Sequence, residues 1–395
     1  MTRSTIVHNF LLAVIAGGAI AASASRAEAA AYTQTDLVSD LSGLAKITDP
    51  SLINPWGLSH SSTSPFWISD QGTNLTNLWM VTGPTTVMKV TGVNPPTGNI
   101  TIPPGGVGAV GPTGQVNNGN TASFLIPVTD GGDGNSAHFI FANLNGTISA
   151  WDMGATSHIV ATTPGAVYTG LAINQTQTML YAANDAGAGS VDVFNSTFGR
   201  VTTPGAFATP SAVAALNLVP FNVRDIGGKV YVEYAPSGRA NQQNAALGQG
   251  AVVVFDENGN FIQTLALGSR LAAPWGIALA PTIDWGPFTG DLLVGNFSYL
   301  NSEIDAYDPI TGAFEGTIPI DPGAGQTAGG LWALDFGIGG SNGDPFTLYV
   351  TDGIDGETHG LFAAISAVPE PTSLALLAAA LGLVAVRRTR SRRLS

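Results

Sequence analysis

Residues 250–256 read Gly-Ala-Val-Val-Val-Phe-Asp, and five further segments of the chain repeat this pattern. Each copy begins at a turn residue, alternates over four or five positions, and reaches a bulky apolar residue just before a polar one. The other copies lie at residues 77–82, 146–152, 189–195, 302–308 and 360–366. Because their polar ends recur every 43 to 70 residues, the pattern indicates one supersecondary unit per repeat.

A second apolar run precedes each copy, and it ends in Asp or Asn in five of the six repeats. In the fourth repeat the run ends in Tyr234, directly after Glu233. Upstream again lies a strand that carries Gly or Pro, as in Ala273-Pro274-Trp275-Gly276. This strand is least clear in the second repeat, where residues 112–116 are the candidate. Edge segments follow at residues 261–267 and 314–320.

Four antiparallel strands in six copies predict an all-β fold, a six-bladed β-propeller over residues 32–367. A single blade cannot bury both of its faces, so the blades stack radially and the ring closes. Glycine suits the first strands, because these crowd around the axis. We expect residues 36–47 to add the outer strand that closes the ring, and residues 92–120 to form an insertion loop. A two-sheet sandwich would not explain why six segments match one another in both their second and their third strands.

The composition limits the function further. Only 10% of the residues are charged, 44% are hydrophobic, and cysteine is absent, which excludes disulfides and thiolate chemistry. Residues 32–368 hold seven basic and 25 acidic side chains, a net charge of about −18. An acidic body of this kind disfavours nucleic acid as a partner.

Both ends of the chain resemble sorting signals. Residues 1–31 combine a basic start, a short apolar run and a small-x-small site, which is typical of a secretory signal peptide cut by signal peptidase. The C-terminal residues combine a proline motif, an apolar stretch that can enter a membrane, and a basic tail. These elements are Val368-Pro369-Glu370-Pro371, residues 374–386, and residues 387–393 with Arg387, Arg388 and Arg390.

In this order, residues 368–395 closely resemble the PEP-CTERM sorting signal. The resemblance implies a Gram-negative bacterium in which an exosortase, a membrane protease, cuts near the proline motif. The protein would then be released to the cell surface or the extracellular matrix. The membrane would be a partner only through the C-terminal segment before that cut.

The body of the chain resembles the uncharacterised propeller family that accompanies PEP-CTERM proteins, and its blades are similar to NHL-type repeats. The segments that carry this resemblance include Asn54-Pro55-Trp56-Gly57, residues 146–149, Ala273-Pro274-Trp275-Gly276, residues 292–297 and residues 330–334. The family implies the propeller fold and no assigned activity. This chain departs from it at Asn184-Asp185, where we expect an aromatic residue and a histidine.

The polar ends of the second strands are the candidate site. If these strands run along the axis, their ends form a ring at one mouth of the central channel. The candidate members are Asp70, Asn143, Asn184, Glu233, Asn296 and Asp352. Such oxygens could hold Ca²⁺, as in six-bladed lactonases of the gluconolactonase type, or they could cap the turns that follow the strands. Capping is the favoured interpretation, and we assign no metal ligands.

No serine elbow, paired-histidine motif or phosphate loop is present in the sequence, so we assign no catalytic residues. Most tryptophans should pack between blades, and a few near a channel mouth could stack on sugars. We therefore expect an exported, noncatalytic binding or scaffold module of the cell surface or matrix, with exopolysaccharide as a candidate partner. The alternative is a Ca²⁺-dependent, lactonase-like hydrolase at the channel mouth.

Overall fold

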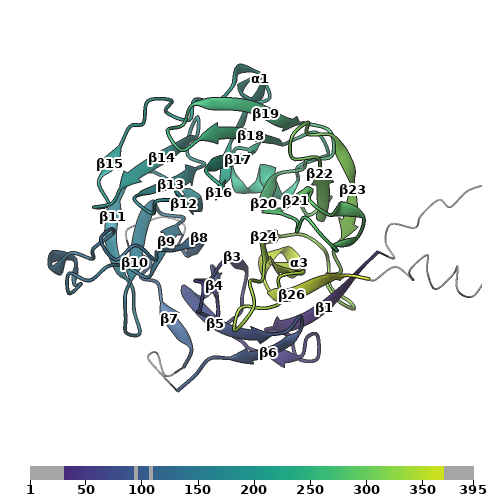
Figure 1. Cartoon of the computed structure of the whole chain (residues 1–395), viewed down its shortest axis with the longest axis horizontal. Coiled ribbons are helices and arrows are strands. Elements are labelled where there is room, and N and C mark those ends of the chain that lie inside the picture. Colours follow the sequence, from purple (N-terminus) through teal and green to yellow (C-terminus); the bar gives the residue numbers. More distant parts are fainter. Residues whose placement is uncertain (1–30, 93–96, 106–109, 369–395) are drawn as a thin grey trace, which may run out of the picture.

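The computed structural model describes residues 31–92, 97–105 and 110–368. These residues form a ring of six antiparallel sheets around a central axis, so the predicted all-β, six-bladed propeller is confirmed (Figure 1). The first strand of each blade lines the axis, and the last strand lies at the rim.

The first three blades follow the chain in order. Blade 1 contains β3 (Pro55–Ser59), β4 (Phe66–Asp70), β5 (Leu75–Thr82) and β6 (Thr86–Lys89), with β7 (Asn99–Thr101) paired to β5. Blade 2 contains β8 (Pro112–Asn117), β9 (Phe139–Asn143), β10 (Thr147–Trp151) and β11 (His158–Thr162). Blade 3 contains β12 (Tyr168–Ile173), β13 (Met179–Asn184), β14 (Ser190–Asn195) and β15 (Arg200–Val201).

The remaining blades continue this pattern. Blade 4 contains β16 (Leu218–Ile226), β17 (Lys229–Pro236), β18 (Ala251–Asp256) and β19 (Phe261–Leu267). Blade 5 contains β20 (Pro274–Leu279), β21 (Leu292–Asn296), β22 (Glu303–Tyr307) and β23 (Phe314–Pro319). Blade 6 contains β24 (Leu331–Phe336), β25 (Thr347–Asp352), β26 (Leu361–Ala367), β1 (Tyr32–Ser39) and β2 (Ile47–Thr48). Short helices in the connections are η2 (Val128–Asp130), α1 (Ser211–Ala214), α2 (Arg239–Gln243), η3 (Gly286–Phe288) and α3 (Ile354–Glu357).

The middle strands are apolar on both faces because each face packs on a neighbouring blade. In β17, Val230 and Val232 join the cluster shared with blade 3, whereas Tyr231 joins the cluster shared with blade 5. The inner strands approach even more closely. A Cβ atom on Gly114 would lie 2.2 Å from the backbone nitrogen of Leu171 in the next blade. Crowding at the axis therefore requires glycine there.

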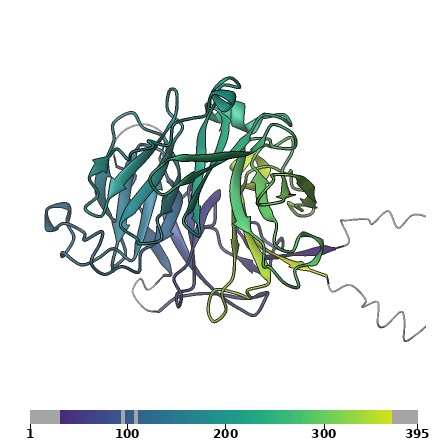
Figure 2. The same cartoon turned by 45° about the horizontal axis from the view of Figure 1, so that its top comes forward.

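An N-terminal strand closes the ring as expected, but it covers residues 32–39 and not the predicted 36–47. β1 pairs antiparallel with β26, the last strand of the chain, and the two lie side by side in both views (Figures 1 and 2). The hydroxyl of Tyr32 donates to the backbone oxygen of Trp285 at 3.0 Å and accepts from the backbone N–H of Phe288 at 3.2 Å. Blade 6 thus combines strands from both ends of the chain, which fastens the ring.

The segment 92–120, which we expected to form a loop, contains two strands where the structure describes it. β7 extends the sheet of blade 1, and β8 is the inner strand of blade 2, at the position that the sequence indicated least clearly. The backbone N–H of Thr101 in β7 donates to the oxygen of Ala155, so this segment also joins blade 1 to blade 2.

The predicted sorting signals fall almost entirely outside the described residues. These include residues 1–30, Pro369, Glu370, Pro371, the apolar stretch 374–386 and the arginines Arg387, Arg388 and Arg390. Val368 is described, and its backbone N–H donates to the oxygen of Ala31 at 2.8 Å. Within the described ranges, no helix has the length and apolar character needed to cross a bilayer.

Candidate functional site

Three tryptophans close one end of the axis. Trp56, Trp275 and Trp332 are each the second residue of an inner strand, in blades 1, 5 and 6. Trp56 stacks on Trp332 with ring centroids 3.6 Å apart, and Trp275 meets Trp332 edge-on at 5.4 Å. All three side chains are buried. The sequence placed them at equivalent positions, and the ring geometry brings them together as an axial plug.

Beyond this plug lies an axial cavity of about 550 Å³, lined by the inner strand of every blade. Trp275 and Gly114 are among the residues that line its deep end. The cavity opens where the inner strands end, at residues such as Leu279 and Ile338, which are 40% and 51% exposed. Its volume falls in the range of small-molecule sites, roughly 300–1,000 Å³.

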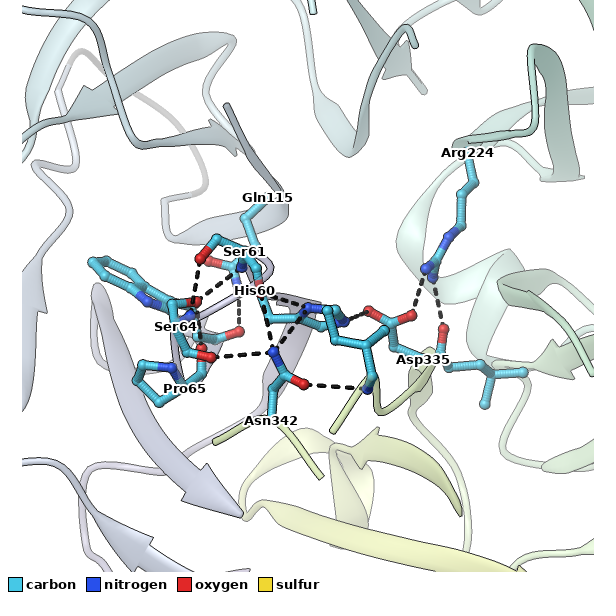
Figure 3. A network of polar contacts seen from close by, with 11 residues as sticks. His60, Ser61, Ser64, Pro65, Gln115, Arg224, Asp335 and Asn342 are labelled. Atoms are coloured by element: carbon cyan, nitrogen blue, oxygen red, sulfur yellow. Dashed lines mark hydrogen bonds and ion pairs between the residues drawn. The ribbon is translucent and has the colours of Figure 1, made fainter. Parts of the chain in front are cut away.

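Three charged or titratable side chains from different blades meet at the cavity mouth (Figure 3). Arg224 of β16 donates from Nη1 to the backbone oxygen of Leu334 at 2.7 Å and from Nη2 to Oδ1 of Asp335 at 2.6 Å. The second carboxylate oxygen of Asp335, in β24, lies 3.6 Å from Nε2 of His60. Two contacts hold the guanidinium, so its position at the mouth is fixed before any ligand arrives.

Asn342 holds the loop that carries His60. Its side chain is fully buried, and its Nδ2 donates to the backbone oxygens of Ser61 at 3.0 Å and Ser64 at 3.2 Å (Figure 3). Its Oδ1 accepts from the backbone N–H of Ile338 at 3.2 Å. The amide therefore ties the mouth loops of blades 6 and 1 together.

The rest of the mouth has a polar and an apolar side. Asp225 accepts from Nε2 of Gln175 at 2.6 Å and from the backbone N–H of Gly228 at 2.9 Å. Burial raises the pKa of the Asp225 carboxyl above its usual range. Phe336 and Ile338 contribute apolar surface from blade 6. A ligand there meets hydrogen-bonding groups and an apolar wall together.

The predicted ring of second-strand ends lies at the opposite end of the axis. Asp70 pairs with Pro55, Asn296 pairs with Pro274, and the equivalent residues likewise pair near the starts of the inner strands. The six candidate residues are buried one strand away from the axis, and none of them lines the cavity. The six residues therefore lie together at one end of the propeller, and they are not part of the cavity or its mouth.

Asn184 caps the turn that follows its strand, whereas Asn296 holds the segment that leads into the inner strand of its blade. Oδ1 of Asn184 accepts from the backbone N–H groups of Val167 at 3.0 Å and Ala186 at 3.1 Å. Oδ1 of Asn296 accepts from the N–H of Ala272 at 2.9 Å, while its Nδ2 donates to Asp305 at 3.1 Å. Asn143 is 3.5 Å from the hydroxyl of Ser149, a weak contact.

The three carboxylates of the ring are fully buried, and their oxygens have no hydrogen-bond partner among the described residues. Burial raises the pKa of Asp352 to about 8 and those of Asp70 and Glu233 well above their usual range. The described part of the chain brings no three acidic or histidine side chains together in a metal-binding group. Buried without hydrogen-bond partners, each carboxylate favours its protonated form.

Glu233 faces the other side of its sheet. Its neighbour Tyr234 pairs with Pro220, as Asp70 pairs with Pro55, and Tyr234 packs in the cluster shared with blade 3. The β-bulge between Pro220 and Asn222 has counterparts at the same place in the other blades, so it does not displace the strand end of blade 4. Tyr234 therefore holds the ring position in blade 4, and Glu233 points toward blade 5.

Sequence reasoning missed the mouth residues because His60, Arg224 and Asp335 are far apart in the chain. Each nevertheless follows the start of its inner strand by four to six residues. Aligning the six inner strands and comparing the residues at that offset would have placed them on one level of the ring.

No protein-family model matches the chain. The uncharacterized protein R648 of Acanthamoeba polyphaga mimivirus is 28% identical over 332 residues, which cover 81% of this chain and 77% of R648. The uncharacterized protein L690 of the same virus is 29% identical over 273 residues, covering 66% of this chain and 67% of L690. Neither name assigns an activity.

Among solved structures, a gluconolactonase from Xanthomonas campestris (XC5397) is 15% identical with a TM-score of 0.36, covering 58% of this chain and 82% of that one. A chain of the nidogen/laminin complex is 13% identical with a TM-score of 0.37, covering 54% and 67%. At these scores neither similarity carries an argument about function.

Proposed function

We propose that the protein is a noncatalytic binding module that holds a small, neutral, hydroxyl-rich ligand in the axial cavity. The observation that carries this proposal is the mouth itself, where Arg224, Asp335 and His60 meet above a cavity that tryptophans close at its far end. Sites of this kind combine apolar walls with a few fixed polar groups.

The charges at the mouth favour a neutral ligand. Arg224 is neutralised by Asp335, and Asp225 adds a second carboxylate to the same rim. Asn117 and Gln177 add groups that both donate and accept hydrogen bonds. Hydroxyl groups of a sugar can satisfy both kinds of partner, whereas an anion would meet the carboxylates.

Binding is favoured over hydrolysis because the mouth groups are engaged with one another. Nδ1 of His60 lies 3.1 Å from the backbone oxygen of Ser61, while Nε2 faces Asp335. Nδ1 also lies 3.3 Å from Nδ2 of Asn342, so both ring nitrogens already have partners among the described residues. The alternative, a Ca²⁺-dependent lactonase using Asp70 and Asp352, places its site at the other end of the axis, among buried side chains.

The cellular setting belongs to the same proposal. A signal peptide at residues 1–31 and a sorting signal at residues 368–395 would carry the propeller through the inner membrane, with processing by signal peptidase and exosortase. An oligosaccharide of the extracellular matrix or cell surface is then the ligand class that fits both the address and the mouth.

Calorimetric titration with neutral oligosaccharides, with uronic-acid oligomers as the charged comparison, tests the proposal. We expect the neutral sugars to bind, and Arg224→Ala to weaken binding by roughly tenfold through the loss of a charged hydrogen bond. Arg200→Ala is the matched control, because Arg200 pairs with Asp192 away from the cavity. Equal effects of both variants, or tighter binding of uronates, would overturn the proposal. Lactone turnover that Asp70→Ala/Asp352→Ala abolishes would support the hydrolase instead.

A further inference from the structure

The closed end of the axis carries a second cluster, which the sugar site does not use. The guanidinium of Arg239, in the short helix α2, lies over three aromatic rings on the outer side of the plug. Its carbon is 4.3 Å from the ring centroid of Phe297 and 4.7 Å from those of Trp56 and Trp332. Aromatic faces arranged around one cation attract it through their quadrupoles.

Glu357 completes the cluster on the acidic side. Its carboxylate forms an ion pair with Nη2 of Arg239 and accepts from Nδ2 of Asn54 at 3.0 Å and Nε2 of Gln243 at 2.9 Å. The hydroxyl of Tyr299 donates to it at 2.6 Å. Four donors from three segments, two of them in α2, therefore fix one carboxylate beside the aromatic rings.

The backbone that presents Glu357 is strained. Asp355, Gly356 and Glu357 are successive residues of α3 with φ angles of 53°, 64° and 68°. A left-handed backbone conformation is unfavourable for residues other than glycine. It persists only where the surrounding structure enforces it. The turn thus holds the carboxylate at a position that relaxed helical geometry would not give.

Arg239 itself is incompletely satisfied. Its Nη1 is buried and has no hydrogen-bond partner among the described residues, although its side chain as a whole is 34% exposed. Burial lowers its pKa to about 9. On the far side of α2, Asp185 contacts the backbone N–H of Gly238 only weakly, at 3.4 Å. Gln243 anchors α2 independently, because its backbone oxygen accepts from the N–H of Tyr299 at 3.0 Å and its Nε2 donates to the Tyr299 hydroxyl at 3.0 Å. The partly exposed Arg239 side chain can therefore leave the cluster while α2 keeps its place.

The geometry points to a cation-binding aromatic cage, formed by Trp56, Trp332, Phe297 and Glu357 and occupied here by the chain's own Arg239. When the Arg239 side chain turns out into solvent, the cage accepts the guanidinium or ammonium group of a ligand. We infer a cationic ligand because the guanidinium of Arg239 occupies the cage in this structure. The net charge of about −18 of residues 32–368 also attracts cations. This site lies at the other end of the axis from the proposed sugar site and does not depend on it.

The test removes the Arg239 side chain from the cage by mutation and adds n-propylguanidinium as a replacement for it. We expect Arg239→Ala to bind this probe saturably, with quenched tryptophan fluorescence and a raised Tm, in comparison with NaCl of equal ionic strength. The affinity of Arg239→Ala for n-propylguanidinium should exceed the affinity of Arg270→Ala for the same probe by roughly tenfold. Arg270 is the matched control because it lies 5.7 Å over a single ring, that of Phe314, with Glu303 as its ion-pair partner. Adding Glu357→Gln should abolish the difference.

The wild-type protein supplies a second measurement that does not require the variant to fold. If the probe competes with Arg239, amide hydrogen exchange in residues 237–243 should accelerate in its presence and not in NaCl. Unchanged exchange in the wild type would overturn the proposal. Binding to Arg239→Ala no tighter than to Arg270→Ala would overturn it as well.

Discussion

The buried carboxyl of Asp352 makes the stability of the protein depend on pH. Asp352 is fully buried and unpartnered, whereas blades 2, 3 and 5 carry Asn143, Asn184 and Asn296 at the equivalent strand end. Burial raises the folded-state pKa of Asp352 to about 8, above its ordinary value of 3.8. Because the unfolded chain loses this proton first, the stability present below about pH 4 is lost progressively as the pH rises toward about 8.

Asp352→Asn should remove this penalty. We expect the free energy of unfolding of the variant to exceed that of the wild type by a margin that grows by up to about 1.4 kcal/mol per pH unit over this window. Urea unfolding at about pH 5 and about pH 8 measures the margin. Asp308→Asn is the control, because Asp308 is an exposed turn residue whose pKa backbone N–H groups lower. A margin that shrinks with pH would contradict the assignment.

At the scale of the strand, the sequence predicts what is repeated and misses what is not. The second and third strands of every blade lie between neighbouring blades and are mostly buried, so apolar residues recur at matching positions and the strands could be found by comparing repeats. In blade 4 the candidate Glu233 lies one residue before Tyr234, which pairs with Pro220 as the other strand ends pair with their inner strands, so the repeat does not place Glu233 in the ring. Arg239 lies in a connection between the second and third strands that differs in length and sequence from blade to blade, so comparison of repeats had no means of finding it.

The closing strand provides a prediction at the same scale. Tyr32 packs with Trp285 and Phe288 and bonds to the backbone of both, so β1 is anchored to blade 5 as well as to β26. Tyr32→Ala should lower the free energy of unfolding by about 3 kcal/mol, since it removes a large buried ring. Denaturant unfolding measures this change, and Thr33→Ala, on the exposed face of the same strand, is the control. Equal effects would show that β1 does not fasten the ring through this residue.

Across the whole molecule, the two ends of the axis differ in kind although the blades repeat. The inner strands begin at a plug of tryptophans that Arg239 covers, and they end at a rim where His60, Arg224 and Asp335 face a cavity. The ring of similar blades thus has one closed and one open end. The difference arises from the residues at the start and at the end of the six inner strands. The repeated residues account for the fold and supply the tryptophans of the plug, whereas Arg239, Glu357 and the charged residues of the rim are departures from the repeat.

Net charge acts on the whole ring and gives the last prediction. Residues 32–368 hold 25 acidic and seven basic side chains, and five of the basic ones already form ion pairs with carboxylates. The remaining acidic groups repel one another, so salt should raise Tm by screening them. Calorimetry in NaCl, after chelation of divalent ions, measures this effect. Because screening depends on ionic strength, CaCl₂ at matched ionic strength should stabilise the protein no further. An additional rise that saturates with Ca²⁺ and disappears in Asp70→Ala/Asp352→Ala would show a bound ion and support the lactonase alternative.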